Sequence, residues 1–203
     1  MVYLRSRALE KERDAHVRLE ALLALSEVPA SPRGAMTLMN VLNHPGNARD
    51  PWIPDAVVIA AAPQGLPFLL DLVKVSPAPL NTGRGGGGGG QAAQGRGRGG
   101  QGDTLTQAGV PRTLRLLSRH YATKAEIPAV MAMINAVKTA GNTAMAVAVL
   151  EGIATGWPEG QVPQFTDAQK AELVAAARGA QSDVAAAFTR VAARWGLPEV
   201  FKE

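Results

Sequence analysis

Cysteine is absent from the 203 residues of this sequence. Its absence excludes disulfide bonds, thiolate catalysis, cysteine-ligated metal and covalently attached c-type haem within the chain. Aromatic residues make up only 4% of the sequence, and alanine fills much of the expected interior instead. Because small side chains let helices approach closely, this composition favours a fold of packed helices.

Long apolar runs are also missing. The residues from Met1 to Ala15 are rich in charge and contain no apolar segment of the kind found in secretory signals. The apolar run Ala144–Leu150 is far shorter than the roughly 20 residues that a membrane-spanning helix needs. We therefore expect neither a secretory signal nor a membrane span, and by default a cytoplasmic protein.

Positive charge is in slight excess, and it is unevenly placed. The formal net charge is +4, and Arg84, Arg96 and Arg98 lie in a glycine-rich stretch without acidic residues between Gly83 and Gly102. Removing these three charges leaves +1 for the rest of the chain. A nearly neutral body argues against a nucleic-acid-binding face, and equally against a helical-repeat DNA glycosylase, which requires a basic concave surface.

The composition also divides the chain. Residues 76–104 hold two early prolines, six consecutive glycines and a Gly-Arg run, and such a segment buries too little apolar surface to offset the entropy of ordering. We predict a disordered insert at 76–104 between N-terminal helical repeats at 1–75 and C-terminal helical repeats at 105–203. The two repeat regions are expected to form one continuous array.

A short pattern recurs in the N-terminal part. Asp14 and Asp50 stand 36 residues apart, and each precedes a helical stretch with a branched aliphatic residue three positions later. A period of this size is typical of solenoids, in which helix pairs bury their apolar faces by stacking. We predict an all-α fold, a right-handed α-solenoid of about five antiparallel helix pairs.

The expected helix boundaries rest on capping residues. Ser31, Asn142 and Ser182 are predicted N-caps, and Thr123-x-x-Glu126 and Thr166-x-x-Gln169 are predicted capping boxes. The expected helices cover about 13–26, 32–42, 51–62, 67–75, 110–121, 124–140, 143–155, 167–180 and 183–195.

The stretch Asp14-x-x-Val17-Arg18-x-x-Ala21-x-x-Ala24-Leu25 resembles the consensus of a HEAT repeat, an armadillo-like helical repeat. The resemblance implies that the aspartate caps a helix and that the arginine bonds between neighbouring units. In the second copy Pro54 replaces the arginine, so the inter-repeat bond is not expected there.

A more specific resemblance rests on three runs: Asn43-His44-Pro45 through Asp50-Pro51-Trp52-Ile53, Leu150 to Trp157, and Ala192 to Gly196. They look like the HEAT region of large exported bacterial proteins that combine a sugar-dehydrogenase-like β-propeller, helical repeats and a c-type cytochrome domain. This resemblance implies a fragment or detached relative of such a protein, and then a periplasmic or exported location.

Tryptophan supplies the candidate partner-binding residues. Trp52, Trp157 and Trp195 each stand at a helix start, in a loop or at a helix end, where packing in the core or between repeats is the usual explanation. Because tryptophan is enriched at binding hot spots, Trp157 and then Trp52 are the candidates for an exposed anchor. Trp157 ranks first because Gly156 and Pro158 flank it in a predicted loop.

The glycine-rich insert supplies the alternative candidates. Residues 95–100 match G-x-G-x-x-G, but no strand precedes them, so we interpret the match as chance. Arg84, Arg96 and Arg98 are the candidate nucleic-acid-binding residues, because flexible arginine-rich segments bind phosphates. A flexible spacer is the simpler interpretation.

Catalytic and metal-binding motifs are not found. His16, His44 and His120 are far apart and belong to different units, so they form no metal or acid–base constellation. We predict a non-catalytic scaffold or protein–protein interaction module without a cofactor, whose partner is an unidentified protein. A nucleic-acid-associated protein that uses the insert is the alternative hypothesis.

Overall fold

The computed structural model describes residues 9, 12, 14–44, 47, 50, 52–74 and 101–197, with the side chains of the last range described from Gly109 onward. Within these residues the regular structure is helical and includes no strand, which confirms the all-α prediction. The helices are α2 (Ala15–Ser26), α3 (Pro32–Asn43), α5 (Ile53–Ala61), the 3₁₀ turn η1 (Ala62–Gln64), α6 (Gly65–Lys74), α7 (Gln101–Ala122), α8 (Ile127–Val137), α9 (Thr143–Gly156), α10 (Asp167–Arg178) and α11 (Ser182–Arg194).

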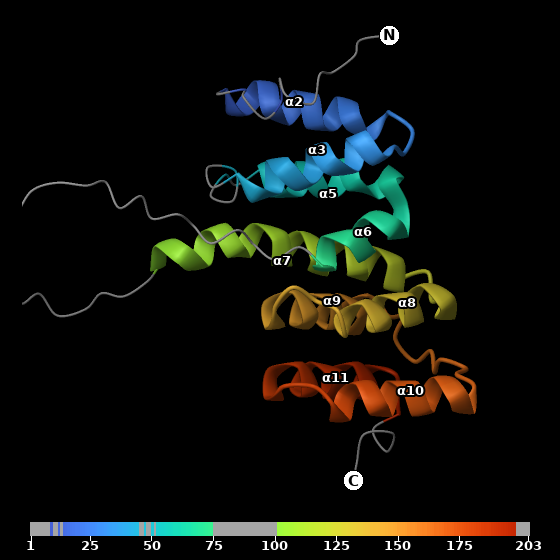
Figure 1. Cartoon of the computed structure of the whole chain (residues 1–203). Coiled ribbons are helices and arrows are strands. Elements are labelled where there is room, and N and C mark those ends of the chain that lie inside the picture. Colours follow the sequence, from blue (N-terminus) through green and yellow to red (C-terminus); the bar gives the residue numbers. More distant parts are fainter. Residues whose placement is uncertain are drawn as a thin grey trace, which may run out of the picture.

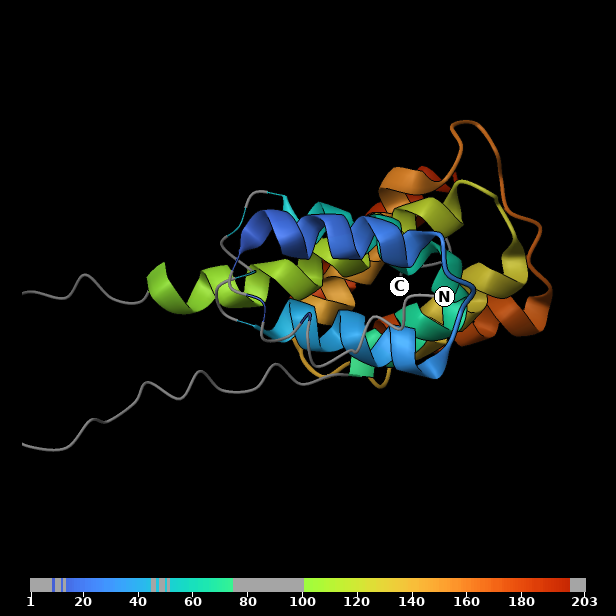
Figure 2. The same ribbon diagram turned by 90° about the horizontal axis from the view of Figure 1, so that it is seen from above.

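The helices are stacked in layers that follow the chain from its N-terminal to its C-terminal end (Figure 1). One row of helices runs through the whole stack: α2 packs on α5, α5 on α7, α7 on α9, and α9 on α11. Beside this row, α6 packs on α8 and α8 on α10, while α3 packs against α5 and α7. Figure 2 looks down the stack and shows α2 (dark blue) and α3 (lighter blue) on its two sides.

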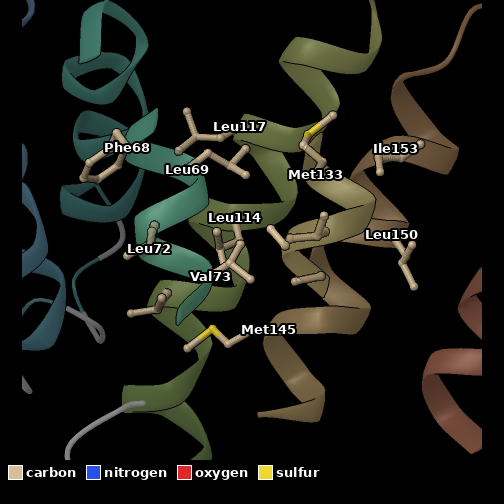
Figure 3. Close-up of a cluster of buried hydrophobic side chains, with 14 of the residues drawn as sticks. Phe68, Leu69, Leu72, Val73, Leu114, Leu117, Met133, Met145, Leu150 and Ile153 are labelled. Atoms are coloured by element: carbon tan, nitrogen blue, oxygen red, sulfur yellow. The ribbon is translucent and has the colours of Figure 1, made fainter. Parts of the chain in front are cut away.

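One continuous hydrophobic core joins the layers. Figure 3 shows its middle part, where α6, α7, α8 and α9 meet through Phe68, Leu69, Leu72, Val73, Leu114, Leu117, Met133, Met145, Leu150 and Ile153. Burying one such side chain stabilises the fold by roughly 1.5–3 kcal/mol. A backbone hydrogen bond of 2.9 Å from the amide of Gly141 to the carbonyl of Val73 also ties the α8–α9 turn to the end of α6.

Capping residues explain where three helices begin. The side-chain oxygens of Ser31, Asn142 and Thr166 accept hydrogen bonds from first-turn amides at 3.1, 3.0 and 3.2 Å. The side chain of Gln169 accepts from the amide of Thr166 at 2.9 Å, which completes the capping box. These three predicted helix starts are confirmed.

Two other predicted caps are wrong. The hydroxyl of Thr123 donates to the carbonyl of His120 at 2.6 Å, and Glu126 precedes α8 without a side-chain cap. The reason is that residues 123–125 continue the last turn of α7, with backbone bonds back to it. Ser182 is the first residue of α11 rather than its cap, because Gln181 occupies that position.

The start of α7 differs from the expectation as well. We expected order to return near Val110 and Pro111, whereas α7 begins at Gln101 and has Pro111 in its interior. Residues 101–104 of the predicted insert therefore belong to a helix, and residues 76–100 lie outside the described residues. An interior proline costs about 3 kcal/mol, and the burial of Leu114 and Leu117 offsets this cost.

The helical run Ile53–Lys74, which comprises α5, η1 and α6, is long and apolar enough to cross a membrane by length and composition alone. Half of its most apolar window is buried inside the protein. Core helices of globular proteins pass the same test, so this run is weak evidence for a membrane span.

Candidate interaction surface

We call the row formed by α2, α5, α7, α9 and α11 the first row. Four of its helices, α5, α7, α9 and α11, carry a set of neighbouring side chains on their solvent-facing side. On each helix these residues recur at intervals of three or four, so they lie along one side of it. We call this surface the grooved face. It consists of Trp52, Asp55, Ile59, Arg112, Arg115, Arg119, Ala144, Val147, Glu151, Asp183, Ala186 and Arg190.

Ion pairs connect neighbouring helices across the grooved face. Arg112 of α7 pairs with Asp55 of α5 at 2.8 Å. Glu151 of α9 is shared by Arg115 of α7 at 3.7 Å and Arg190 of α11 at 3.4 Å. Exposed pairs of this kind contribute only about 0–1 kcal/mol each. Their value here is geometric, because each pair shows that the side chains it joins, from two different helices, lie next to each other.

Two hollows lie on either side of α9 in the grooved face. The first, between α7 and α9, has a volume of about 380 Å³ and an alanine and valine wall formed by Ala144, Val147 and Ala148. The second, between α9 and α11, has a volume of about 510 Å³ and shares Ala144 and Val147 with the first. The exposed side of α9 is thus a low ridge of small apolar side chains between two grooves.

The α5 end of the grooved face is apolar and exposed. Trp52 is 68% exposed and Ile59 is 51% exposed, and both lie on the same side of α5 as Asp55. Large exposed apolar side chains mark interaction sites when they gather on one surface. Trp52, one of the two tryptophans predicted as anchors, is therefore placed where a partner can reach it.

Trp157, the first-ranked anchor, does not have an exposed position. Its side chain is 1% exposed and its indole N–H donates to the carbonyl of Gln161 at 2.6 Å. The ring meets that of Trp195 edge-on, at 5.9 Å between centroids, and Phe165 adds a second edge contact to Trp195 at 5.0 Å. The loop after α9 folds Trp157 inward, so it belongs to the core and we withdraw it as an anchor.

The other predicted site residues do not come together. Arg84, Arg96 and Arg98 lie outside the described residues, as does the G-x-G-x-x-G match. His16, His44 and His120 are all exposed and belong to α2, the end of α3 and α7. The ring of His120 contacts that of Tyr121 edge-on at 5.5 Å, and burial raises the pKa of the Tyr121 hydroxyl above its usual value.

A third hollow, of about 470 Å³, lies between the α8–α9 and α10–α11 turns, and its wall combines alanine and valine with polar side chains such as Asn142 and Gln181. The nearby ammonium of Lys138 is engaged by Glu172 at 3.2 Å. No group of three or more His, Cys, Asp or Glu side chains in the described part of the chain could hold a metal ion.

Sequence reasoning did not find the grooved face. One signal was available: Arg112, Arg115 and Arg119 are spaced as one side of a helix. A second was the series Ala144, Ala148, Gly152 and Gly156, small residues at every fourth position of one helix. Neither signal indicates which helices become neighbours. The grooved face forms only because α5, α7, α9 and α11 pack side by side.

Comparisons of the chain with protein-family models, with curated proteins and with solved structures gave no match. The HEAT resemblance therefore stays a prediction.

Proposed function

We propose that this chain is a non-catalytic helical-repeat scaffold of HEAT type that binds another protein through the grooved face. In this proposal the stacked helices form a right-handed solenoid of antiparallel pairs. The mechanism is the presentation of a rigid surface, and partner choice depends on the side chains of one row of helices.

The repeat part of the proposal is supported by the two aspartates. Asp14 accepts from the amide of His16 at 2.8 Å, and Asp50 accepts from the amides of Trp52 and Ile53 at 2.8 and 3.0 Å. Each carboxylate therefore stabilises the start of a first-row helix, as expected for two copies of one unit.

A contact of Arg18 with the connection to the next unit adds to this support. The guanidinium of Arg18 on α2 donates to the side-chain oxygen of Asn47, in the connection between α3 and α5. The side-chain amide of Asn47 in turn donates to the carbonyl of Val41 at 2.8 Å. The arginine that the HEAT resemblance singles out thus joins α2 to the connection that leads to α5, and Asn47 joins that connection to α3.

The observation that carries the binding function is the grooved face itself: exposed Trp52 and Ile59, two apolar hollows beside α9, and arginines next to both. Interfaces typically combine buried aromatic and aliphatic anchors with arginine, while most of the remaining surface adds little energy.

The test is capture of a partner by the purified full chain and by two matched double variants. W52E/I59E places two carboxylates on the grooved face. V28E/M36E makes the same change at two exposed apolar residues outside that face, Val28 in the turn after α2 and Met36 on α3. A partner is isolated from the native source, purified, and mixed with each purified protein. We expect it to bind the parent chain and V28E/M36E but not W52E/I59E. Equal binding by all three proteins would contradict the proposal.

The more specific resemblance leads to a second measurement. If the chain joins redox domains of a larger exported protein, the native polypeptide has a mass well above 21.2 kDa and shows haem absorbance. A native mass of 21.2 kDa without a chromophore would contradict that role and leave a free-standing scaffold.

A further inference from the structure

We propose that the grooved face binds an acidic, amphipathic helix, whose apolar side chains cover Ala144 and Val147 and whose carboxylates pair with Arg115, Arg119 and Arg190. This inference rests on the proposed function, since it names the chemistry of the partner for the same surface.

The helices α7, α9 and α11 run in the same direction across the grooved face. Pro111 shares a hollow with Ala144, near the start of α9, whereas Arg119 lies against Gly156 at its end. On the other side of α9, Asp183 and Ala186 share a hollow with Ala144 and Val147, and Arg190 reaches Glu151. The face therefore has an apolar end, where Ala144, Val147 and Ala186 lie with Arg112 and Asp183 at the edges of the hollows. Arg112 is paired with Asp55 there. The other end, which we call the basic end, holds Arg115, Arg119 and Arg190 with Glu151.

The apolar end has room for side chains of a partner. The ridge of Ala144 and Val147 is low, and hollows of about 380 and 510 Å³ flank it. Packed helices lie about 8–10 Å apart with the ridges of one in the grooves of the other. A partner helix laid over α9 can place its own apolar ridges in these two hollows.

The basic end has more guanidinium groups than carboxylates. Arg115 and Arg190 share the single carboxylate of Glu151, and Arg119 makes no ion pair within the described part of the chain. The one other carboxylate of α11 in this face, Asp183, lies in the first turn at the opposite end, where the helix dipole stabilises it. Carboxylates of a partner at the basic end would thus balance the excess positive charge of the arginines there.

The distance between the two ends fits a helix. Ala144 and Glu151 are separated by about two turns of α9, or roughly 10 Å. A partner helix that carries apolar residues on two neighbouring turns and carboxylates about two turns further matches both ends. A phosphate backbone would match the arginines but would leave the apolar hollows empty, so the observations favour an acidic protein helix over nucleic acid.

The test uses a fluorescein-labelled synthetic peptide of about 18 residues, which as a helix spans roughly 27 Å. One half carries leucines at helical spacing and the other half carries glutamates. Titration with the full chain, followed by fluorescence anisotropy, is expected to show saturable binding that weakens with added salt. A peptide of the same composition in scrambled order should bind about tenfold more weakly or worse, because it lacks the apolar stripe.

Variants of the chain locate the binding. R115E/R190E should weaken binding of the peptide about tenfold or more, since two attractions become repulsions. R33E/R178E changes two exposed arginines of α3 and α10 by the same charge and should leave the affinity unchanged. E151Q removes the carboxylate that competes for Arg115 and Arg190 and should tighten binding about threefold or more. Misfolding cannot explain a gain of affinity.

The outcomes separate this inference from the proposed function. Equal peptide binding by the chain, R115E/R190E and E151Q would overturn the inference. Tighter binding of a labelled single-stranded oligonucleotide with the same variant pattern would also overturn it, in favour of nucleic acid. If the peptide fails while partner capture still depends on Trp52 and Ile59, the grooved face is an interface of different chemistry and only the inference is lost. If neither the peptide nor a captured partner binds in a way that depends on the grooved face, both the inference and the proposed function are contradicted.

Discussion

Gly152 of α9 lies so close to Ser118 of α7 that a Cβ atom on Gly152 would stand 2.6 Å from the Cβ of Ser118. One turn later, a Cβ on Gly156 would stand 2.8 Å from the Cα of Arg119. Non-bonded carbon atoms pack at about 3.5–4.0 Å, so only glycine permits this approach. Because α7 carries Arg115 and α9 carries Glu151, the two glycines also determine how the grooved face is assembled.

We expect G152A to destabilise the protein by about 1–3 kcal/mol, because the added methyl group forces α7 and α9 apart. Alanine has the higher helix propensity by about 1 kcal/mol, so a loss of stability would show that packing dominates. The control is G179A, since a Cβ there would lie 3.5 Å from the carbonyl oxygen of Ala175, an ordinary contact distance. Urea denaturation of both variants measures the difference. Equal stability of G152A and G179A would contradict the close packing.

The tryptophans should respond in opposite ways to truncation. W157A removes a buried ring that packs on Trp195 and should cost about 3–5 kcal/mol. W52A changes a side chain that is 68% exposed and should stay within about 0.5 kcal/mol of the parent. Thermal and chemical denaturation of the two variants provide the test. A neutral W157A would show that the ring is not part of the core.

Asn47 joins Arg18 to the carbonyl of Val41 while only 3% exposed. N47A would leave buried polar groups on both sides without partners, and we expect a cost of about 1–3 kcal/mol. N135A is the control, because Asn135 is exposed and its side-chain oxygen accepts a hydrogen bond from the exposed ammonium of Lys138 at 2.8 Å. If N47A and N135A unfold at the same denaturant concentration, the bonds through Asn47 do not hold α2, α3 and their connection to α5 together energetically.

Stability should fall at high pH through Tyr121. Burial raises the pKa of its hydroxyl above its usual value, so the folded protein keeps this proton at pH values where the unfolded chain has lost it. Stability is therefore unaffected below the unfolded pKa and decreases as the pH rises from there to the folded pKa. Melting curves of the parent and Y121F between about pH 8 and about pH 11 should diverge only at the upper end. Parallel curves throughout would contradict the shift.

The sequence by itself determined the local structure. At Ser31, Asn142 and Thr166 a side-chain oxygen bonds to a first-turn amide and begins a helix, because this contact spans only three residues. At Thr123 and Ser182, where residues of the same type were predicted to cap, the surrounding chain decided otherwise. Val184, Ala187, Phe188, Val191 and Trp195 recur at helical spacing and are all buried, since this periodicity places them on one side of the helix.

Only the tertiary structure decided which helices became neighbours. The neighbours of Trp157 are a loop residue and a ring that lies 38 positions later in the chain, so no local pattern could separate an exposed anchor from a core residue. The same holds for Glu151, whose two arginines come from helices on either side of α9. Side-chain spacing along one helix indicates which residues share a side, whereas the contacts of that side depend on the register between helices, which packing at Gly152 and Gly156 sets.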